Sequence, residues 1–253
     1  MTNLIYQCWH GDIPRGAMVS RTLMQNYAKR IGAEYRCDVA EKKATADAYF
    51  AMLRPVTDPS FDVYDKIAVL DMDIYPVDGL TRDVFDEDCG DFAMAQEPHQ
   101  PEFRSWPVVP FITSSQDDDW ASRFDVDFPR DENGRLIVFN SGVVLFSKSG
   151  RRRLRQQMWP IPTFQKLTMG LHPFYRWDQH YMHAMAFVLP GIDFRELSVE
   201  WNRQVHGLLC DDIYDKRTEH TKFVHVQLRG ANGWDFQQLS DVVNAEVPCT
   251  RPA

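Results

Sequence analysis

The order of short apolar runs and helical segments near the start of the chain limits the folds that are open to it. Strands are predicted at residues 4–9, 34–38 and 67–70, and helices at residues 17–31 and 47–53. The third strand is continuously apolar, as expected for a strand that is covered on both faces. A strand–helix–strand–helix–strand order predicts an α/β fold with a mostly parallel, Rossmann-like central sheet and helices on both of its faces.

The rest of the chain continues this alternation, with one exception. Further strands are predicted at residues 92–96, 136–146 and 222–228, and helices at residues 149–159, 177–187 and 236–243. Residues 97–133 are rich in Pro, Asp and Trp and are predicted to form a long loop, which could contribute to a binding site. No repeat or domain boundary is evident, so we expect one domain over residues 1–253.

Charge and cysteine usage exclude several classes of protein. The formal net charge of −8 argues against a nucleic-acid-binding protein, because phosphate backbones favour basic surfaces. The five cysteines are scattered and include no CxxC pair, which argues against a zinc site or a disulfide framework and predicts a reducing, cytoplasmic location. The sequence predicts neither a signal peptide nor a transmembrane segment.

Two aspartates follow the third predicted strand directly, in the segment KIAVLDMDIYPVDG (66–79). Because alternate residues of an extended chain project to the same side, Asp71 and Asp73 can converge on one cation. Carboxylate oxygens are the ligands that Mg²⁺ and Mn²⁺ prefer, often in sites shared with phosphate groups. Aspartates are also common where a strand simply turns into a loop.

A phosphatase of the haloacid-dehalogenase type is one functional alternative, with Asp71 as nucleophile and Asp73 as the second aspartate. In that class the aspartate pair normally continues as Asp-Gly-Thr and follows the first strand of the fold. Here Ile74-Tyr75-Pro76 follows, and an earlier strand–helix–strand unit precedes the pair. Both differences count against the phosphatase.

Four further segments occur in a characteristic order. They are IYQCWHGDIP (5–14), IVFNSGVVLF (137–146), WDQHYMHAMA (177–186) and FVHVQLRGANGWD (223–235). Together with the Asp-x-Asp motif they resemble the retaining glycosyltransferases of GT-A fold, both the glycogenin-like family 8 and the Asp-x-Asp group that includes the large glucosylating toxins. The resemblance extends over about residues 3–235 but depends on short motifs.

The resemblance implies a metal-dependent transferase that moves a sugar from a nucleotide-sugar, typically a UDP-sugar in this class, with retention of configuration. Asp71, Asp73 and His225 would hold Mn²⁺ or Mg²⁺, and Asp178 and Asn140 would be the catalytic residues beside the reacting sugar. The residues implied in donor binding are Trp9, Asp71, Ser141, Gly142, Gln179 and Gly230. The acceptor is open, and could be a saccharide, a protein or a small molecule.

One departure from the family pattern bears on activity. The late segment of the glycogenin group contains Lys-Pro before its Trp, whereas Asn232-Gly233 precedes Trp234 here. The lysine that binds the diphosphate in that group is therefore missing, and Arg229 is a candidate substitute. A catalytically inactive module that still binds a nucleotide-sugar is accordingly a third alternative.

Overall fold

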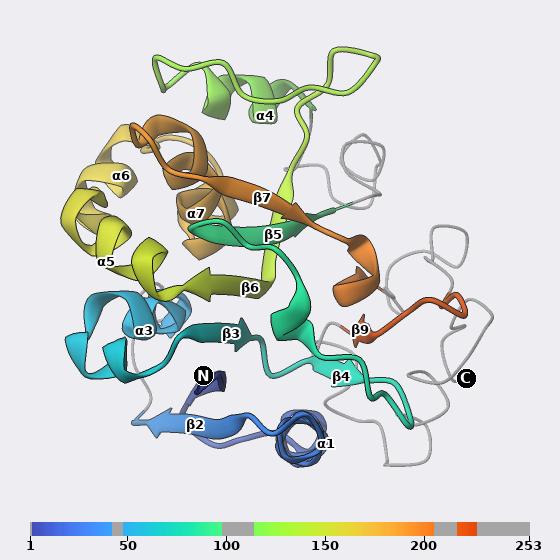
Figure 1. Ribbon diagram of the computed structural model, residues 1–253. Coiled ribbons are helices and arrows are strands. Elements are labelled where there is room, and N and C mark those ends of the chain that lie inside the picture. Colours follow the sequence, from blue (N-terminus) through green and yellow to red (C-terminus); the bar gives the residue numbers. More distant parts are fainter. Residues whose placement is uncertain (1, 42–47, 98–113, 205–216, 227–253) are drawn as a thin grey trace.

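The computed structural model describes residues 2–41, 48–97, 114–204 and 217–226, which build a six-stranded sheet with helices on both faces (Figure 1). In spatial order its strands are β2 (Glu34–Ala40), β1 (Leu4–His10), β3 (Lys66–Leu70), β6 (Phe139–Ser147), β5 (Phe92–Gln96) and β7 (Phe194–Leu197). β6 runs antiparallel to both of its neighbours, and the other pairs are parallel. The predicted α/β class with a mostly parallel sheet is confirmed.

The helices differ in length and in the face that they cover. The α-helices are α1 (Arg15–Ile31), α3 (Arg54–Thr57), α4 (Ser114–Ala121), α5 (Lys148–Gln157), α6 (Ile161–Leu167) and α7 (Asp178–Val188). Short 3₁₀ turns are η1 (Phe50–Leu53), η2 (Pro59–Val63), η3 (Val84–Asp86), η5 (Pro173–Arg176) and η6 (Val199–Trp201). In Figure 1, α5, α6 and α7 lie together on one side, away from α1.

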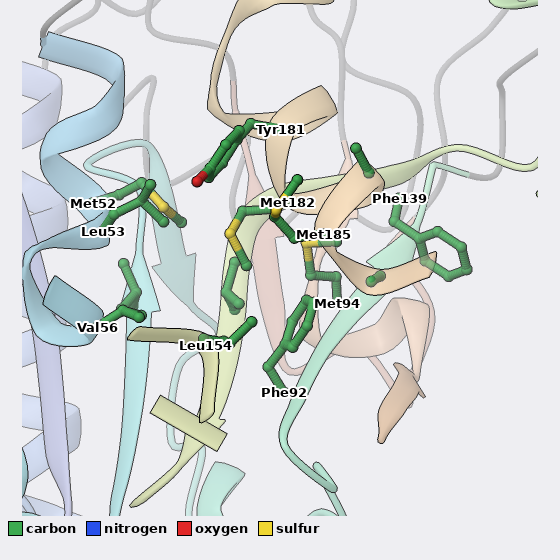
Figure 2. Packing of buried hydrophobic residues seen from close by; sticks show 14 of the residues in the cluster. Met52, Leu53, Val56, Phe92, Met94, Phe139, Leu154, Tyr181, Met182 and Met185 are labelled. Atoms are coloured by element: carbon green, nitrogen blue, oxygen red, sulfur yellow. The ribbon is translucent and has the colours of Figure 1, made fainter. Parts of the chain in front are cut away.

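Alternate residues of the strands pack into two separate apolar clusters, one on each face of the sheet. The buried sheet residues of the first cluster are Leu4, Tyr6, Ile67, Val69, Phe92, Met94, Phe139, Val144 and Phe146. Those of the second cluster are Ile5, Ala68, Leu70, Ala93, Ala95, Val143, Leu145 and Leu197. Figure 2 shows Met182 and Met185 of α7 beside Phe92 and Met94 in the first cluster. Burial on both faces explains why residues 67–70 of β3 and 92–95 of β5 are continuously apolar.

A second, three-stranded sheet lies beyond the end of β3. Its order is β4 (Ile74–Pro76), β9 (Phe223–His225) and β8 (Arg203–Gln204). Three residues separate the end of β3 from the beginning of β4, so the chain leaves one sheet and enters the other through residues 71–73. In Figure 1, β4 and β9 both lie to the right of the large sheet. The Asp-x-Asp motif therefore occupies the junction between the two sheets.

Several predicted boundaries differ from the structure. The strand predicted at residues 136–146 begins only at Phe139, and α5 is capped by Ser147 rather than by Ser149, because the Ser147 hydroxyl accepts a hydrogen bond from Gly150 N–H at 3.0 Å. The stretch 97–133, predicted as a loop, contains α4. The helix predicted at residues 236–243 lies outside the described residues.

Two findings bear on the predictions about thiols and membranes. Cys8, Cys37 and Cys89 are free thiols, whereas Cys210 and Cys249 lie outside the described part of the chain. Among the described residues, no helix combines the length and the apolar character that crossing a membrane requires.

An arginine–aspartate cluster joins α5 to η2 and gives a first prediction. Asp62 accepts hydrogen bonds from Arg155 at 2.9 and 3.2 Å and from Arg152 at 2.9 Å. The bonds from Arg155 and Arg152 lower the pKa of Asp62 to about 2. Its stabilising contribution is therefore present above the pKa of the unfolded chain, about 3.9, and is lost as the pH falls toward 2.

We expect Asp62→Asn to lower the free energy of unfolding by about 1–2 kcal/mol at neutral pH, a value reduced for partial exposure of the cluster. Urea unfolding at neutral pH and at about pH 3 measures the effect, and the difference between variant and wild type should shrink at the lower pH. Equal stability of the two proteins at neutral pH would contradict the prediction.

Candidate active site

The turn between the two sheets fixes the backbone of the Asp-x-Asp motif. Asp71 N–H donates to the Gly142 carbonyl at 2.9 Å, and the Asp71 carbonyl accepts from the Gln7 side chain at 2.9 Å. The Asp73 carbonyl accepts from Val226 N–H, also at 2.9 Å. Both aspartates are half-buried. Two strands, β1 and β6, and the residue that follows β9 thus hold the backbone of the motif.

His225 reaches the same place from the end of β9. The antiparallel register pairs Ile74 with His225, and the His225 Nε2 atom lies 3.3 Å from Asp73 Oδ1. One ligand atom each from Asp71, Asp73 and His225 lies within 4.8 Å of the others. Two carboxylates and an imidazole suit Mn²⁺, which accepts mixed nitrogen and oxygen ligands, so the three residues fit the divalent cation that the sequence predicts.

The electrostatics of the cluster favour a cation. Desolvation by the surrounding protein, with the charges of Asp73 and Asp178, raises the pKa of Asp71 well above its usual range. Burial opposes protonation of His225, but the charge and hydrogen bond of Asp73 outweigh it and raise the pKa of the imidazole. Three carboxylates in one enclosed region repel each other, and a bound divalent cation would relieve that repulsion.

Asp178 begins α7 and lies next to the cluster. Its Oδ2 atom accepts a hydrogen bond from the Ser141 hydroxyl at 3.1 Å. Burial raises the pKa of Asp178 to about 6, although the Ser141 hydroxyl and backbone N–H groups at the start of the helix partly offset this. The carboxylate is therefore ionised at neutral pH, and in that form it can stabilise positive charge that develops close to it.

Cys8 is a neighbour of these carboxylates that the sequence analysis did not single out. Burial, followed by the charges of Asp71 and Asp178, raises the pKa of the Cys8 thiol. The thiol stays protonated at neutral pH, which argues against Cys8 as a nucleophile.

The amide of Asn140 is fully engaged within the protein. Its Oδ1 atom accepts from Gly142 N–H and from Asn202 Nδ2, both at 2.8 Å. Its Nδ2 atom donates to Glu97 and to Gln179, both at 3.0 Å. These four bonds use the whole capacity of the amide. A direct bond from Asn140 to a sugar hydroxyl would have to replace one of them, so its predicted catalytic contact stays a prediction.

Position 142 has room only for a glycine, because the His225 ring lies directly beside it. A Cβ atom at residue 142 would lie 2.6 Å from His225 Cε1 and 2.8 Å from Asn140 Oδ1. The space beside this glycine is therefore filled by the imidazole ring. Whether its backbone also approaches a donor, as predicted, stays a prediction.

The remaining predicted donor-binding residues are dispersed. Gln179 donates to Glu97 at 3.3 Å and so belongs to the Asn140 network. Trp9 is half-buried near the end of β1, and its indole N–H donates to the Asp12 carbonyl at 2.9 Å. Gly230 lies outside the described residues. The roles of all three in donor binding stay predictions.

Two buried residues of the network carried no predicted role, Glu97 and Asn202. Glu97 directly follows β5, and Asn202 follows η6 in the segment EWNRQVHG (200–207). The sequence signal for Glu97 was its place as a polar residue directly after an apolar strand. The sequence signal for Asn202 was the Trp-Asn pair to which it belongs. Neither signal indicates the hydrogen-bond partner. The bonds from Glu97 and Asn202 to Asn140 join residues 40 or more positions apart, and the contact of Asn202 with His225 depends on the second sheet.

Comparison with known proteins supports the fold. No protein-family model matches the chain, and no curated protein matches its sequence. Among solved structures, mouse xyloside xylosyltransferase 1 in its apo form is similar, with 15% identity, a TM-score of 0.53 and coverage of 90% of this chain and 99% of that chain. The galactosyltransferase LgtC, solved with donor and acceptor sugar analogues, has 12% identity, a TM-score of 0.51 and coverage of 95% of each chain.

A third structure, the apo form of the bifunctional glycosyltransferase WbbM, has 11% identity and a TM-score of 0.52, and the match covers 87% of this chain and 45% of that one. At these identities the likeness concerns the arrangement of the chain. The protein has the GT-A fold that these glycosyltransferases share.

Proposed function

We propose that the protein is a metal-dependent glycosyltransferase that moves a sugar from a nucleoside-diphosphate donor, a UDP-sugar, to an acceptor. The observation that carries the proposal is the convergence of Asp71, Asp73 and His225 at the junction of the two sheets, next to Asp178. Such a cluster on a GT-A fold is suited to a donor whose diphosphate shares a cation with the protein. The acceptor is a saccharide, a protein or a small molecule.

In this proposal the protein contributes mainly position and charge. Asp71, Asp73 and His225 would hold Mn²⁺ or Mg²⁺, which when bound neutralises negative charge on the diphosphate leaving group. Asp178, oriented by Ser141, would lie beside the reacting sugar and stabilise positive charge on its ring. The donor would be bound by Trp9, Gln179, Gly142 and Gly230. Retention of configuration follows from the resemblance in sequence.

A thermal-shift series with nucleotides and nucleotide-sugars, with and without Mn²⁺, tests the proposal. We expect one class of nucleotide to stabilise the protein strongly only when Mn²⁺ is present, because a ligand that binds the folded state alone raises its stability. The nucleotide that does so identifies the base. No stabilisation by any donor would overturn the proposal.

Asp73→Asn provides the matching variant. We expect it to weaken Mn²⁺-dependent nucleotide binding at least about tenfold, since even an outer partner of a metal ligand typically contributes that much. Asp88→Asn is the control, because Asp88 is highly exposed and lies in the turn that precedes β5. Equal binding by Asp73→Asn and wild type would contradict a metal role for the motif.

Activity measurements on the wild type and these variants distinguish the transferase from the two alternatives, the phosphatase and the inactive binding module. Metal-dependent hydrolysis of an aryl phosphate that Asp71→Asn abolishes would favour the phosphatase. Mn²⁺-dependent donor binding with no release of sugar or nucleotide, with or without candidate acceptors, would favour the inactive module. Slow release of both products by wild type, absent in the Asp73→Asn variant, is what the transferase predicts.

A further inference from the structure

Asn202 lies between the predicted metal ligand His225 and the Asn140 network. It is fully buried, with 0% of its surface exposed. Its Oδ1 atom is 3.0 Å from His225 Nδ1, and its Nδ2 atom donates to Asn140 Oδ1 at 2.8 Å. Its backbone N–H donates to the Val199 carbonyl at 2.9 Å, which fixes the position from which the side chain extends.

The direction of every hydrogen bond in this chain of amides follows from one backbone donor. Gly142 N–H can only donate, so the Asn140 atom that it contacts is the oxygen. That oxygen can only accept, so the Asn202 atom facing it is the NH₂ group. The other end of the Asn202 amide is therefore its oxygen, which faces His225. The orientation does not depend on choosing an amide flip.

The consequence concerns the imidazole. The amide oxygen of Asn202 faces Nδ1 at 3.0 Å, whereas Asp73 Oδ1 faces Nε2 at the longer distance of 3.3 Å, so the two oxygens compete for the one proton of the neutral ring. The shorter contact favours the proton on Nδ1, which leaves the lone pair on Nε2. Nε2 is the atom that lies 3.3 Å from Asp73 Oδ1, on the side of the Asp-x-Asp motif. A metal ligand needs this arrangement, in which one ring nitrogen is held by a hydrogen bond and the lone pair of the other is directed at the cation.

We propose that Asn202 is the positioning residue of the site, which holds His225 in the Nδ1–H form with Nε2 directed at the cation held by Asp71 and Asp73. The proposal depends on the proposed function for the identity of the metal site, although the tautomer itself can be measured without metal. Glu97 completes the chain at its other end, because it accepts from Asn140 at 3.0 Å and fixes that amide from the far side.

The first test measures the tautomer in the wild-type protein. Long-range proton–nitrogen correlation spectra of the metal-free protein, at a pH at which the ring is neutral, distinguish a protonated from an unprotonated ring nitrogen. The His225 signal is identified by its loss in a His225→Gln variant. We expect a protonated Nδ1 and an unprotonated Nε2. A proton on Nε2, or an even mixture, would overturn the proposal.

The second test removes the amide while keeping its approximate volume. Asn202→Leu is expected to lose the single tautomer and to bind Mn²⁺ about 10- to 100-fold more weakly, measured from the electron paramagnetic resonance signal of free Mn²⁺. Thr168→Val is the matched control: Thr168 is also fully buried, and its hydroxyl donates to the Phe164 carbonyl at 2.9 Å at the end of α6. The control should change neither the tautomer nor the affinity.

The outcomes separate this proposal from the function on which it depends. If wild type does not bind Mn²⁺, the metal-site assignment fails, and the spectra still decide whether Asn202 selects the tautomer. If wild type binds Mn²⁺ and Asn202→Leu binds it equally well with an unchanged tautomer, Asn202 is only a buried core residue. Should Asn202→Leu not fold, the wild-type spectra remain decisive, because they require no variant.

Discussion

Replacing Asp178 by asparagine should greatly reduce sugar transfer and at the same time stabilise the protein above neutral pH. The carboxylate is buried at the start of α7 and accepts from Ser141. Removing its charge takes away a group that would stabilise positive charge on the sugar, so we expect turnover to fall by about 100-fold or more. Release of nucleotide from the donor measures this effect.

The gain in stability follows from the direction of the pKa shift. The pKa of Asp178 is raised to about 6 by burial, so the ionised carboxylate is disfavoured in the folded state. The contribution of this group to stability is fully present below the pKa of the unfolded chain and is lost as the pH rises through about 6. An asparagine avoids this loss, and should add about 1–3 kcal/mol to the free energy of unfolding at about pH 8.

The measurement is urea unfolding in EDTA at about pH 8 and about pH 4, since a bound cation would offset the effect. The gain should be clear at the higher pH and nearly absent at the lower one. Asp91→Asn is the matched control, because Asp91 is also buried but accepts from Arg153 at 2.8 Å and from Asp193 N–H at 2.9 Å. It should lower stability and keep activity. A destabilised Asp178→Asn would contradict the prediction.

The sequence predicted the large sheet better than the small one, for a physical reason. Residues 67–70 of β3 are continuously apolar because they are buried on both faces, and that pattern is visible within the segment itself. β4, by contrast, has three residues and includes Pro76, and it is a strand only because it pairs with β9, some 150 positions away. Nothing local predicts such a pairing.

The same distinction between local pattern and distant contact applies to the residues of the candidate site. Asp71 and Asp73 were identified from their spacing after a strand, and the structure places them close to His225. Their role as metal ligands stays a prediction. Asn202 and Glu97 were missed as site residues because their importance lies in hydrogen bonds between distant segments. A sequence indicates which residues could bind a cation, whereas the residues that orient them are defined by the tertiary contacts.

Gly142→Ala should disrupt the same site by steric means alone. Its Cβ atom would lie 2.6 Å from His225 Cε1 and 2.8 Å from both His225 Nδ1 and Asn140 Oδ1. Neither neighbour can move freely, because His225 is held by Asn202 at 3.0 Å and the Asn140 amide makes four hydrogen bonds. We expect a loss of about 1–3 kcal/mol in the free energy of unfolding, typical of overpacking in a rigid core.

The displaced imidazole distinguishes this variant from an ordinary core mutation. Since His225 would leave its place beside Asp73, Mn²⁺ affinity should fall at least about tenfold, as it does when the surroundings of a metal ligand are disturbed. Val144→Ala, a cavity mutation in the same strand, is the control. It should lose comparable stability and keep its Mn²⁺ affinity. Equal Mn²⁺ affinity of Gly142→Ala and this control would contradict the prediction. It would mean that His225 does not bind the metal from its position beside residue 142.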